Sequence, residues 1–256
     1  MKLTFLGSGS AFTDINSNFH SNMLLESPTH KRLLIDCGTD IRHSLQALHL
    51  SYSNIDSVYI SHLHFDHVGG LEWLAFSTYF NHTTPRPKLF IHPSMVEPLW
   101  NNVLSGGLQS LEGETSATLD TYFDLPPIRD GKFFTWESIN FEMIKTIHVS
   151  NAKDLLPSYG LFFSIGETKI FLSTDMQFTP ERYMNYYQNA DVIFHECETD
   201  EPQSGVHSHF KQLLTLDSSI KAKMWLYHYS DKKMPDAKNL GFKGFVKRGQ
   251  AFHFED

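Results

Sequence analysis

The chain has 256 residues, of which 41% are hydrophobic and 20% charged, with a mean hydropathy of -0.29. These values are typical of a globular chain and exclude intrinsic disorder, collagen and coiled coil. The 21 basic and 29 acidic residues give a net charge of -8, so the surface as a whole repels phosphate polymers and anionic membranes. No apolar stretch resembles a signal peptide or a membrane span. We therefore expect a cytoplasmic protein with no membrane partner, in which Cys37 and Cys197 are free thiols.

The first part of the chain predicts strands that meander before helices begin. A strand over residues 2–6 ends in a Gly-Ser turn, and a hairpin of residues 21–26 and 32–36 follows. Apolar residues at helical spacing then predict a helix over residues 41–48, with Thr39 as its N-terminal cap.

The next segment alternates strands with helices. A short strand over residues 58–60 runs directly into the sequence HLHFDHVGG, and a helix is expected to start near Gly70. A strand over residues 88–91 precedes a helix over residues 95–104. Residues 105–130 are polar and rich in turn formers, so we expect a substrate lid or an oligomer contact there, with a plain surface loop as the alternative.

The second half repeats this style without a linker or an internal repeat. Strands are expected over residues 139–149, 161–165, 169–173, 192–194 and 224–227, and helices over residues 179–188 and 210–216. We therefore expect one domain over residues 1–256, with a layered α/β fold in which helices cover sheets.

Histidine is over-represented, with 15 residues in the chain. The sequence His62-x-His64-x-Asp66-His67 places four metal-competent side chains within six residues, between a strand and a helix. Imidazole and carboxylate ligands suit Zn, Fe, Mn or Ni, whereas Ca and Mg prefer oxygen alone. Three further apolar runs each end near a metal-competent residue, and these residues are His148, Asp175 and His228. Each of these metal-competent residues lies at or just after the end of a predicted strand, so we expect them to meet at one edge of the sheets. We therefore predict two neighbouring metal sites at that edge.

The motif HxHxDH, a later His, an Asp in S-T-D and a final His together resemble the metallo-β-lactamase superfamily over the whole chain. The resemblance implies an αββα four-layer sandwich with a dinuclear centre on one sheet edge. It assigns seven ligands to two divalent ions, which we expect to be zinc, with manganese as the alternative. His62, His64 and His148 would bind the first ion, Asp66, His67 and His228 the second, and Asp175 would bridge them.

Further motifs resemble one branch of this superfamily. The opening FLGSGSAFT, with SNMLLE and LLIDCG, is similar to the RNase Z-like tRNA 3′-processing endonucleases and to related phosphodiesterases, including cyclic-nucleotide enzymes. His195-Glu196 and His207-Ser208 resemble the HEAT-type and HST-type motifs of that branch. The resemblance makes His207 the proton donor to the leaving oxygen and Glu196 its partner, with Asp66 completing the catalytic set. The alternative for His207 is an ordinary surface histidine before a helix.

The sequence departs from the processing nucleases in one informative place. Short members of that group carry a flexible arm between the positions matched here by His148 and Asp175, and only 26 residues separate these two. Two divalent ions would also keep the centre positive within an acidic chain, which favours one small phosphodiester over a long polyanion. We therefore predict a dinuclear phosphodiesterase acting on a small phosphodiester, with a cyclic nucleotide favoured, by attack of a metal-bridged hydroxide.

Several alternatives stay open. The chain could be an RNase Z-like tRNA endonuclease, a metallohydrolase of a thioester or lactone, or a metal-binding protein without hydrolytic activity. Extended nucleic acid is not an expected partner, and a homodimer is expected because relatives in this branch commonly form one. Phe80, Tyr122, Phe123 and Tyr159 could stack on a nucleobase, but core packing is the default in a chain with 14% aromatic residues.

Overall fold

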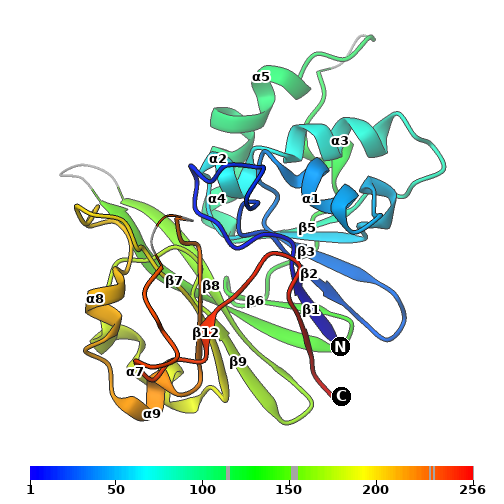
Figure 1. Ribbon diagram of the computed structural model, residues 1–256. Helices are drawn as coiled ribbons and strands as arrows, with labels where there is room; N and C mark the ends of the chain where they lie inside the picture. The colour runs from blue at the N-terminus through cyan, green and yellow to red at the C-terminus, as the bar shows by residue number, and fades with distance from the viewer. Residues whose placement is uncertain (114–115, 151–154, 231, 233, 256) are drawn as a thin grey trace.

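Two β-sheets packed face to face form the centre of the molecule, as the computed structural model shows (Figure 1). The structure describes residues 1–113, 116–150, 155–230, 232 and 234–255. The first sheet has the order β13-β1-β2-β3-β4-β5, and the second has the order β12-β11-β10-β9-β8-β7-β6. The strands of the first sheet are β1 (Lys2–Phe5), β2 (Met23–Glu26), β3 (Arg32–Ile35), β4 (Ser57–Ile60), β5 (Lys88–Ile91) and β13 (Ala251–His253). Those of the second are β6 (Phe133–Trp136), β7 (Ile139–Ser150), β8 (Leu155–Ile165), β9 (Thr168–Leu172), β10 (Val192–Glu196), β11 (Met224–Tyr227) and β12 (Gly244–Phe245).

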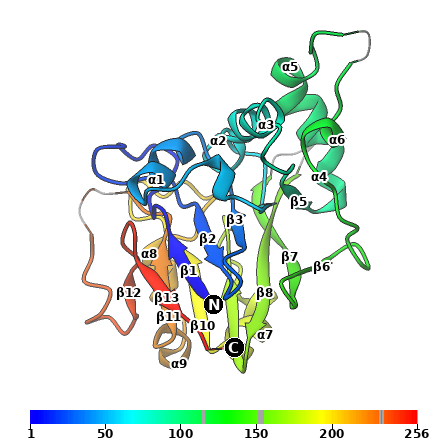
Figure 2. The same ribbon diagram turned by 90° about the vertical axis from the view of Figure 1, so that its right-hand side faces the viewer.

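Helices cover the outer face of each sheet (Figures 1 and 2). Beside the first sheet lie α1 (Ile41–Ala47), η1 (Tyr52–Asn54), α2 (Phe65–Val68), α3 (Leu71–Tyr79), α4 (Pro93–Pro98), the π-helical η2 (Leu99–Leu104), α5 (Ser105–Leu108) and α6 (Leu119–Tyr122). Beside the second lie α7 (Pro180–Asn189), α8 (Phe210–Leu213) and α9 (Ser218–Lys221). This arrangement confirms the expected four-layer α/β sandwich. None of the described helices has the length and apolar character needed to cross a bilayer.

Strand direction places many strand ends at one edge of the molecule. In the first sheet β3, β4 and β5 are parallel, and β1 runs in the same direction because β2 is antiparallel to both β1 and β3. In the second sheet β9, β10 and β11 are parallel, and β7 shares their direction through the antiparallel β8. The carboxyl ends of all these strands therefore lie at the upper edge in Figures 1 and 2, opposite the N-terminus.

Aromatic side chains fill the space between the sheets. Tyr59 of β4 stacks on Phe134 of β6 with a centroid distance of 5.5 Å, and Phe134 stacks in turn on Phe141 at 4.7 Å. Nearer the other side, Phe5 of β1 meets Phe194 of β10 at 5.1 Å. These contacts lock the two sheets together, because a close-packed interior resists any sliding of one layer over the other.

One local expectation and one alternative interpretation from the sequence are wrong. The N-cap of α1 is Asp40 rather than Thr39, and its carboxylate makes no capping bond because Oδ2 accepts a hydrogen bond from the His20 N–H at 2.7 Å. The described part of residues 105–130 is not a plain surface loop either. It contains α5 and α6, and Tyr122 and Phe123 from it are buried in the core.

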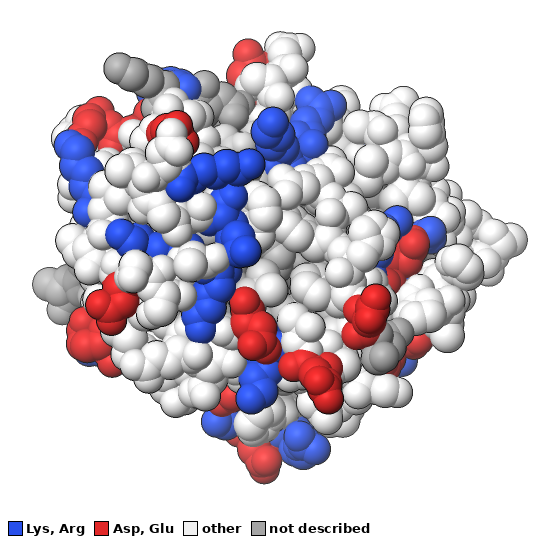
Figure 3. Space-filling view, turned by 60° about the horizontal axis from the view of Figure 1, so that its bottom comes forward, with Lys and Arg blue, Asp and Glu red and all other residues white. Residues whose placement is uncertain are grey.

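The surface charge is unevenly distributed. Figure 3 shows a band of Lys and Arg on the face seen from the lower end of Figure 1, with Asp and Glu grouped beside it.

Gly38 provides a test of how tightly the strand-end loops pack. A Cβ at Gly38 would lie 2.1 Å from the backbone oxygen of Asp66, which cannot move without shifting α2. We expect Gly38→Ala to lower the free energy of unfolding by about 1–3 kcal/mol and to reduce the metal content of the purified protein. Thermal unfolding and elemental analysis measure the two effects.

The matched control is Gly106→Ala in α5, where an added Cβ would meet nothing within 4 Å. It should leave the metal content unchanged and should not destabilise the protein, since alanine is favoured over glycine in a helix by up to about 1 kcal/mol. Equal behaviour of the two variants would contradict the packing argument.

Candidate metal centre

The first sheet contributes four potential ligands from one short turn. β4 ends at Ile60, and the chain then passes through Ser61 and His62 before α2 begins at Phe65. His64 is the N-cap of α2, and Asp66 and His67 lie within this four-residue helix. The dense spacing in the sequence therefore becomes a set of side chains gathered around one strand end.

The second sheet contributes three more from separate strand ends, each with an irregular backbone. His148 is the extra residue of a β-bulge, between the pairs Ile147–Pro157 and Val149–Leu156. Asp175 follows β9 after Thr174, whose φ is 51°, and His228 follows β11 with its own φ of 59°. A bulge and left-handed residues cost conformational energy, and such strain commonly aims side chains at functional sites.

The Gly-Ser turn after β1 hydrogen-bonds to the end of β11, where His228 lies. The backbone N–H of His228 donates to the Ser8 carbonyl at 2.8 Å, and Gly9 pairs with both His20 and Tyr229 in isolated bridges. The turn therefore links the first sheet to the loop that presents His228.

One group of ligand atoms comprises three histidines and an aspartate. His64 Nδ1 lies 3.1 Å from His62 Nε2 and 3.0 Å from His148 Nε2. Asp175 Oδ2 lies 3.6 Å from each of these two Nε2 atoms. The four atoms enclose one point, and all four residues are buried except the half-buried His64.

A second group shares the same aspartate. Asp66 Oδ2 lies 3.2 Å from both His67 Nε2 and His228 Nε2. Asp175 Oδ2 lies 3.4 Å from the former nitrogen and 3.5 Å from the latter. All four residues are buried. Asp175 Oδ2 thus belongs to two adjoining groups, which is the arrangement expected for a bridging carboxylate.

These separations fit metal coordination. Bonds of about 2.0–2.2 Å to a tetrahedral ion place ligand atoms about 3.3–3.6 Å apart, close to the observed range. Among the described residues, His67 Nε2 is buried without a hydrogen-bond partner, an unfavourable condition that coordination would relieve. The donor set of imidazoles and carboxylates suits a divalent transition ion.

Hydrogen bonds to the far side of each ring orient the coordinating nitrogens. His67 Nδ1 donates to Asp36 Oδ2 at 2.8 Å, and His148 Nδ1 donates to the Val206 carbonyl at 2.8 Å. Ser61 Oγ donates to Asp36 Oδ2 at 2.8 Å and can accept from His62 Nδ1 at 3.1 Å. In His62, His67 and His148 a proton on Nδ1 leaves the lone pair of Nε2 directed at the centre.

The pKa shifts agree with a site that requires added positive charge. Burial lowers the pKa of His62 well below its usual range and that of His148 to about 4, so both rings are neutral. Burial also opposes charge on His67, but the carboxylates of Asp66, Asp175 and Asp36 outweigh it and raise the pKa of that ring. A divalent ion would provide the charge that these three buried carboxylates attract.

Beside the second group lies a histidine–glutamate pair. His207 Nδ1 is 3.3 Å from Glu196 Oε2 and 3.9 Å from Asp175 Oδ2. Glu196 Oε1 is fixed by the backbone N–H of Ser208 at 2.6 Å. Burial would lower the pKa of His207, yet Glu196 and Asp175 raise it to about 9. The ring is thus held in a form that can give up a proton.

The neighbouring histidines have structural roles. The ring of His195 is fully buried between the Tyr187 hydroxyl at 2.8 Å and the Glu196 carbonyl at 2.7 Å, and burial lowers its pKa to about 4. His209 caps α8 through a bond from the Lys211 N–H. His207 differs from both, because 21% of its side chain is exposed, and it lines a pocket.

This pocket has a volume of about 230 Å³ and opens beside the second group of ligands. Its inner wall includes His207 and His228. Loops from three strand ends form the remainder, and their lining residues are Ser10, Ala11, Phe12, Glu198, Thr199, Asp200, Ser204, Val206 and Ser230. A small ligand in this pocket would therefore contact the candidate acid and adjoin the candidate metal centre.

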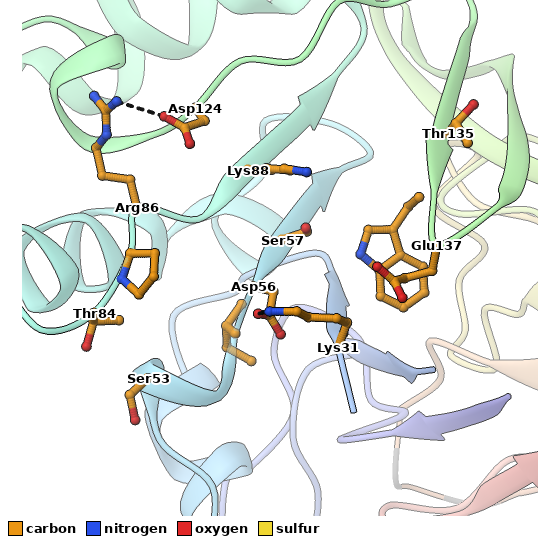
Figure 4. Close-up of a pocket in the computed structure, with 13 residues that line it drawn as sticks. Lys31, Ser53, Asp56, Ser57, Thr84, Arg86, Lys88, Asp124, Thr135 and Glu137 are labelled. Carbon is orange, nitrogen blue, oxygen red and sulfur yellow. Dashed lines mark hydrogen bonds and ion pairs between the residues drawn. The ribbon is translucent and has the colours of Figure 1, made fainter. Parts of the chain in front are cut away.

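Another cavity, of about 300 Å³, lies at the amino ends of β4 and β5, away from these histidines (Figure 4). Lys31 pairs with Asp56 at 2.7 Å, and Arg86 pairs with Asp124 at 2.8 Å, as the dashed line in Figure 4 shows. These ion pairs engage Lys31 and Arg86, and the described residues that line this cavity include no histidine or cysteine that could bind a transition metal.

The structure brings together every residue proposed from the sequence for metal binding or catalysis. It adds Asp36 and Ser61, which sequence reasoning did not assign to the site. Asp36 directly follows the apolar run Leu33-Leu34-Ile35, so a strand end bearing a carboxylate was the available signal. Tyr122, Phe123 and Tyr159 are buried and do not form a base-stacking surface.

The fold and the arrangement of these residues define a protein of the metallo-β-lactamase fold. YhfI from Bacillus subtilis, a metallo-β-lactamase fold protein, superposes with a TM-score of 0.76 at 19% identity, covering 98% of this chain and 99% of that one. The short form of human tRNase Z superposes with a TM-score of 0.69 at 18% identity, covering 99% of both chains. These likenesses concern the fold.

The chain belongs to the family described as Anti-Pycsar protein Apyc1, whose model matches residues 1–252. A relative with that name from Paenibacillus harenae is 36% identical over 233 residues, which cover 90% of each chain. Another from Bacillus phage 010DV004 is 30% identical and covers 98% of both.

The hydrogen bond from His67 to Asp36 can be tested through metal affinity. We expect Asp36→Asn to weaken divalent metal binding by about 10–100-fold, since loss of such an outer carboxylate leaves the ligand ring poorly oriented and less basic. Competition with a chromogenic chelator measures the affinity.

Asp56→Asn is the matched control, because Asp56 accepts hydrogen bonds from Lys31 and from the Arg32 N–H at the opposite end of the sheet. It should bind metal as the unaltered protein does. An unchanged affinity in Asp36→Asn would show that this carboxylate does not support the centre.

Proposed function

We propose that this protein is a metal-dependent phosphodiesterase that hydrolyses a small phosphodiester, with a cyclic nucleotide as the favoured substrate. The observation that carries the proposal is the position of His207 and Glu196 directly beside two groups of ligand atoms that share Asp175. Seven ligands are assigned to two divalent ions, for which zinc is the first candidate and manganese the second: His62, His64, Asp66, His67, His148, Asp175 and His228.

The ions, when bound, would supply a nucleophilic hydroxide near neutral pH and positive charge toward the phosphate oxygens. The chain's own residues supply the rest of the chemistry. Asp66 and Asp175 provide the carboxylate oxygens that lie between the His67 and His228 nitrogens of the second group. Glu196 engages Nδ1 of His207, which leaves Nε2 to deliver a proton to the departing ribose oxygen. An alkoxide leaving group requires such an acid, whereas an acyl substrate has less need of one.

The size and charge of the site support a small substrate. A pocket of about 230 Å³ is smaller than the roughly 300–1,000 Å³ usual for sites that enclose a drug-sized ligand. Glu198 and Asp200 lie on its wall, so they repel further phosphates along a polymer. Between His148 and Asp175 the described residues form the strands β8 and β9, which leave little chain for an RNA-binding arm.

The direct test is a product-resolved turnover assay with Zn- and Mn-loaded protein. Substrates should include 3′,5′- and 2′,3′-cyclic nucleotides, bis(p-nitrophenyl) phosphate, an unprocessed tRNA, a thioester and a lactone. We expect ring opening of a cyclic nucleotide with the tRNA left intact. Cleaved tRNA beside untouched cyclic nucleotides would favour a processing endonuclease, and turnover of the thioester or lactone alone would favour an acyl hydrolase.

The role of His207 predicts an effect that depends on the leaving group. His207→Ala should slow cyclic-nucleotide hydrolysis by about 10²–10⁴-fold while both ions remain bound. It should slow hydrolysis of bis(p-nitrophenyl) phosphate much less, because p-nitrophenolate departs without protonation. Paired kcat measurements and metal analysis check this.

His43→Ala, at an exposed position on α1, is the matched control and should retain both activities. If His207→Ala slows both substrates equally, or loses metal, then His207 is a ligand or a structural residue and not the acid.

A further inference from the structure

Phe12 is the most exposed large hydrophobic side chain of the described part of the molecule, with 93% of its surface accessible. It follows the Gly-Ser turn after β1 and lines the pocket that contains His207 and His228. A bare aromatic ring forgoes the free energy that burial would give, so a ligand that covers Phe12 in this pocket would gain from the contact.

The backbone around Phe12 is anchored to the metal-binding edge. The Ser10 N–H donates to the Tyr229 carbonyl at 3.0 Å, next to His228, and the Thr13 N–H donates back to Ser10 at 3.1 Å. The Ala11 carbonyl lies 3.2 Å from Nε2 of His20. These bonds on both sides of Phe12 fix the place of its backbone relative to the candidate centre.

A second exposed aromatic ring supports the first. Phe65, which is 45% exposed, lies between His64 and Asp66 in the sequence. The Phe12 and Phe65 centroids are 6.2 Å apart with the rings inclined at 44°, and Phe65 rests on His20 at 5.7 Å in an edge contact. The pair connects the pocket rim to the ligand-bearing turn.

The positions of the charged side chains in the pocket determine the direction in which a nucleotide would bind. Its inner end carries His207 and His228 beside the candidate metal centre, and its wall carries the carboxylates of Glu198 and Asp200. The phosphate therefore belongs at the inner end, where positive charge would gather, and the uncharged base belongs away from it. Because the pocket is small, the base would emerge at the rim, where Phe12 lies.

We propose that Phe12, supported by Phe65, is a stacking platform for the nucleobase of the substrate. This inference rests on the proposed function, and it makes Phe12 a substrate-binding residue. Stacking recognises the π-face that every base presents, and its loss on substitution by alanine corresponds to about 5- to 150-fold in affinity.

A pair of probes with and without a base provides a readout independent of turnover. Calorimetry on Zn-loaded protein compares a nucleoside 5′-monophosphate with ribose 5-phosphate, which carries the same phosphate and sugar. We expect the nucleotide to bind about 10–100-fold more tightly, and Phe12→Ala to remove most of that advantage. Phe12→Trp should preserve it, and Phe12→Leu, which is apolar but has no π-face, should preserve little.

Phe80→Ala is the matched control, because Phe80 is 65% exposed at the end of α3 and does not line this pocket. With cyclic nucleotides, Phe12→Ala should raise KM about 10–100-fold with a smaller change in kcat. Phe80→Ala should change neither the binding nor the kinetics.

The outcomes separate the platform from the proposed function. If Phe12→Ala keeps the full preference for the base-bearing probe while cyclic nucleotides are hydrolysed, the platform is wrong and the function stands. If the preference is lost in Phe12→Ala but no phosphodiester is turned over, the platform stands and the function is wrong. If Phe12→Ala instead converts a dimer to a monomer in light scattering and leaves probe binding unchanged, Phe12 is a subunit contact and the inference is overturned.

Discussion

One carboxylate oxygen, Oδ2 of Asp175, lies 3.4–3.6 Å from the coordinating nitrogens of four histidines. Two of these, His62 and His67, come from the first sheet, and the other two come from the second. Such a convergence requires the edges of both sheets to stay in one relative position. The aromatic contacts between the sheets provide that constraint, because Tyr59 and Phe134 stack across the interface directly below the ligand-bearing end of β4.

Much of this arrangement could be predicted from the sequence, because the apolar runs and the histidine spacing that indicate it are local patterns. The apolar run that ends at Ile60 and the spacing of His62, His64 and His67 need no knowledge of distant contacts. The later strands also stand out as apolar runs, and β5 and β11 have the bounds that their runs predict. Strand ends also indicated His148, Asp175 and His228, and the resemblance to a known superfamily then implied how the seven ligands divide between two ions, which spacing alone does not determine.

Features that depend on tertiary contacts were less accessible. Asp36 supports His67 only because β3 and β4 are parallel neighbours, which brings a residue 31 positions earlier beside the ring. Phe12 is a single aromatic residue in a polar loop, and nothing local distinguishes it from a core residue. The predicted N-cap of α1, Thr39, is wrong by one residue. The N-cap is Asp40, whose carboxylate accepts a hydrogen bond from the His20 N–H outside the helix. In each case the deciding contact joins segments far apart in the chain.

The first sheet is completed by its most distant neighbours in the sequence. β1 pairs with β13, and the amino group of Met1 donates to the Phe254 carbonyl at 2.8 Å. The Ser8 carbonyl, just after β1, also holds the backbone of His228. During biosynthesis, β1 must therefore wait with one edge unpaired until residues 251–253 have left the ribosome. The last of the seven ligands, His228, is also translated late, so a nascent chain that ends before this residue presents only an incomplete set of ligands to cellular metal.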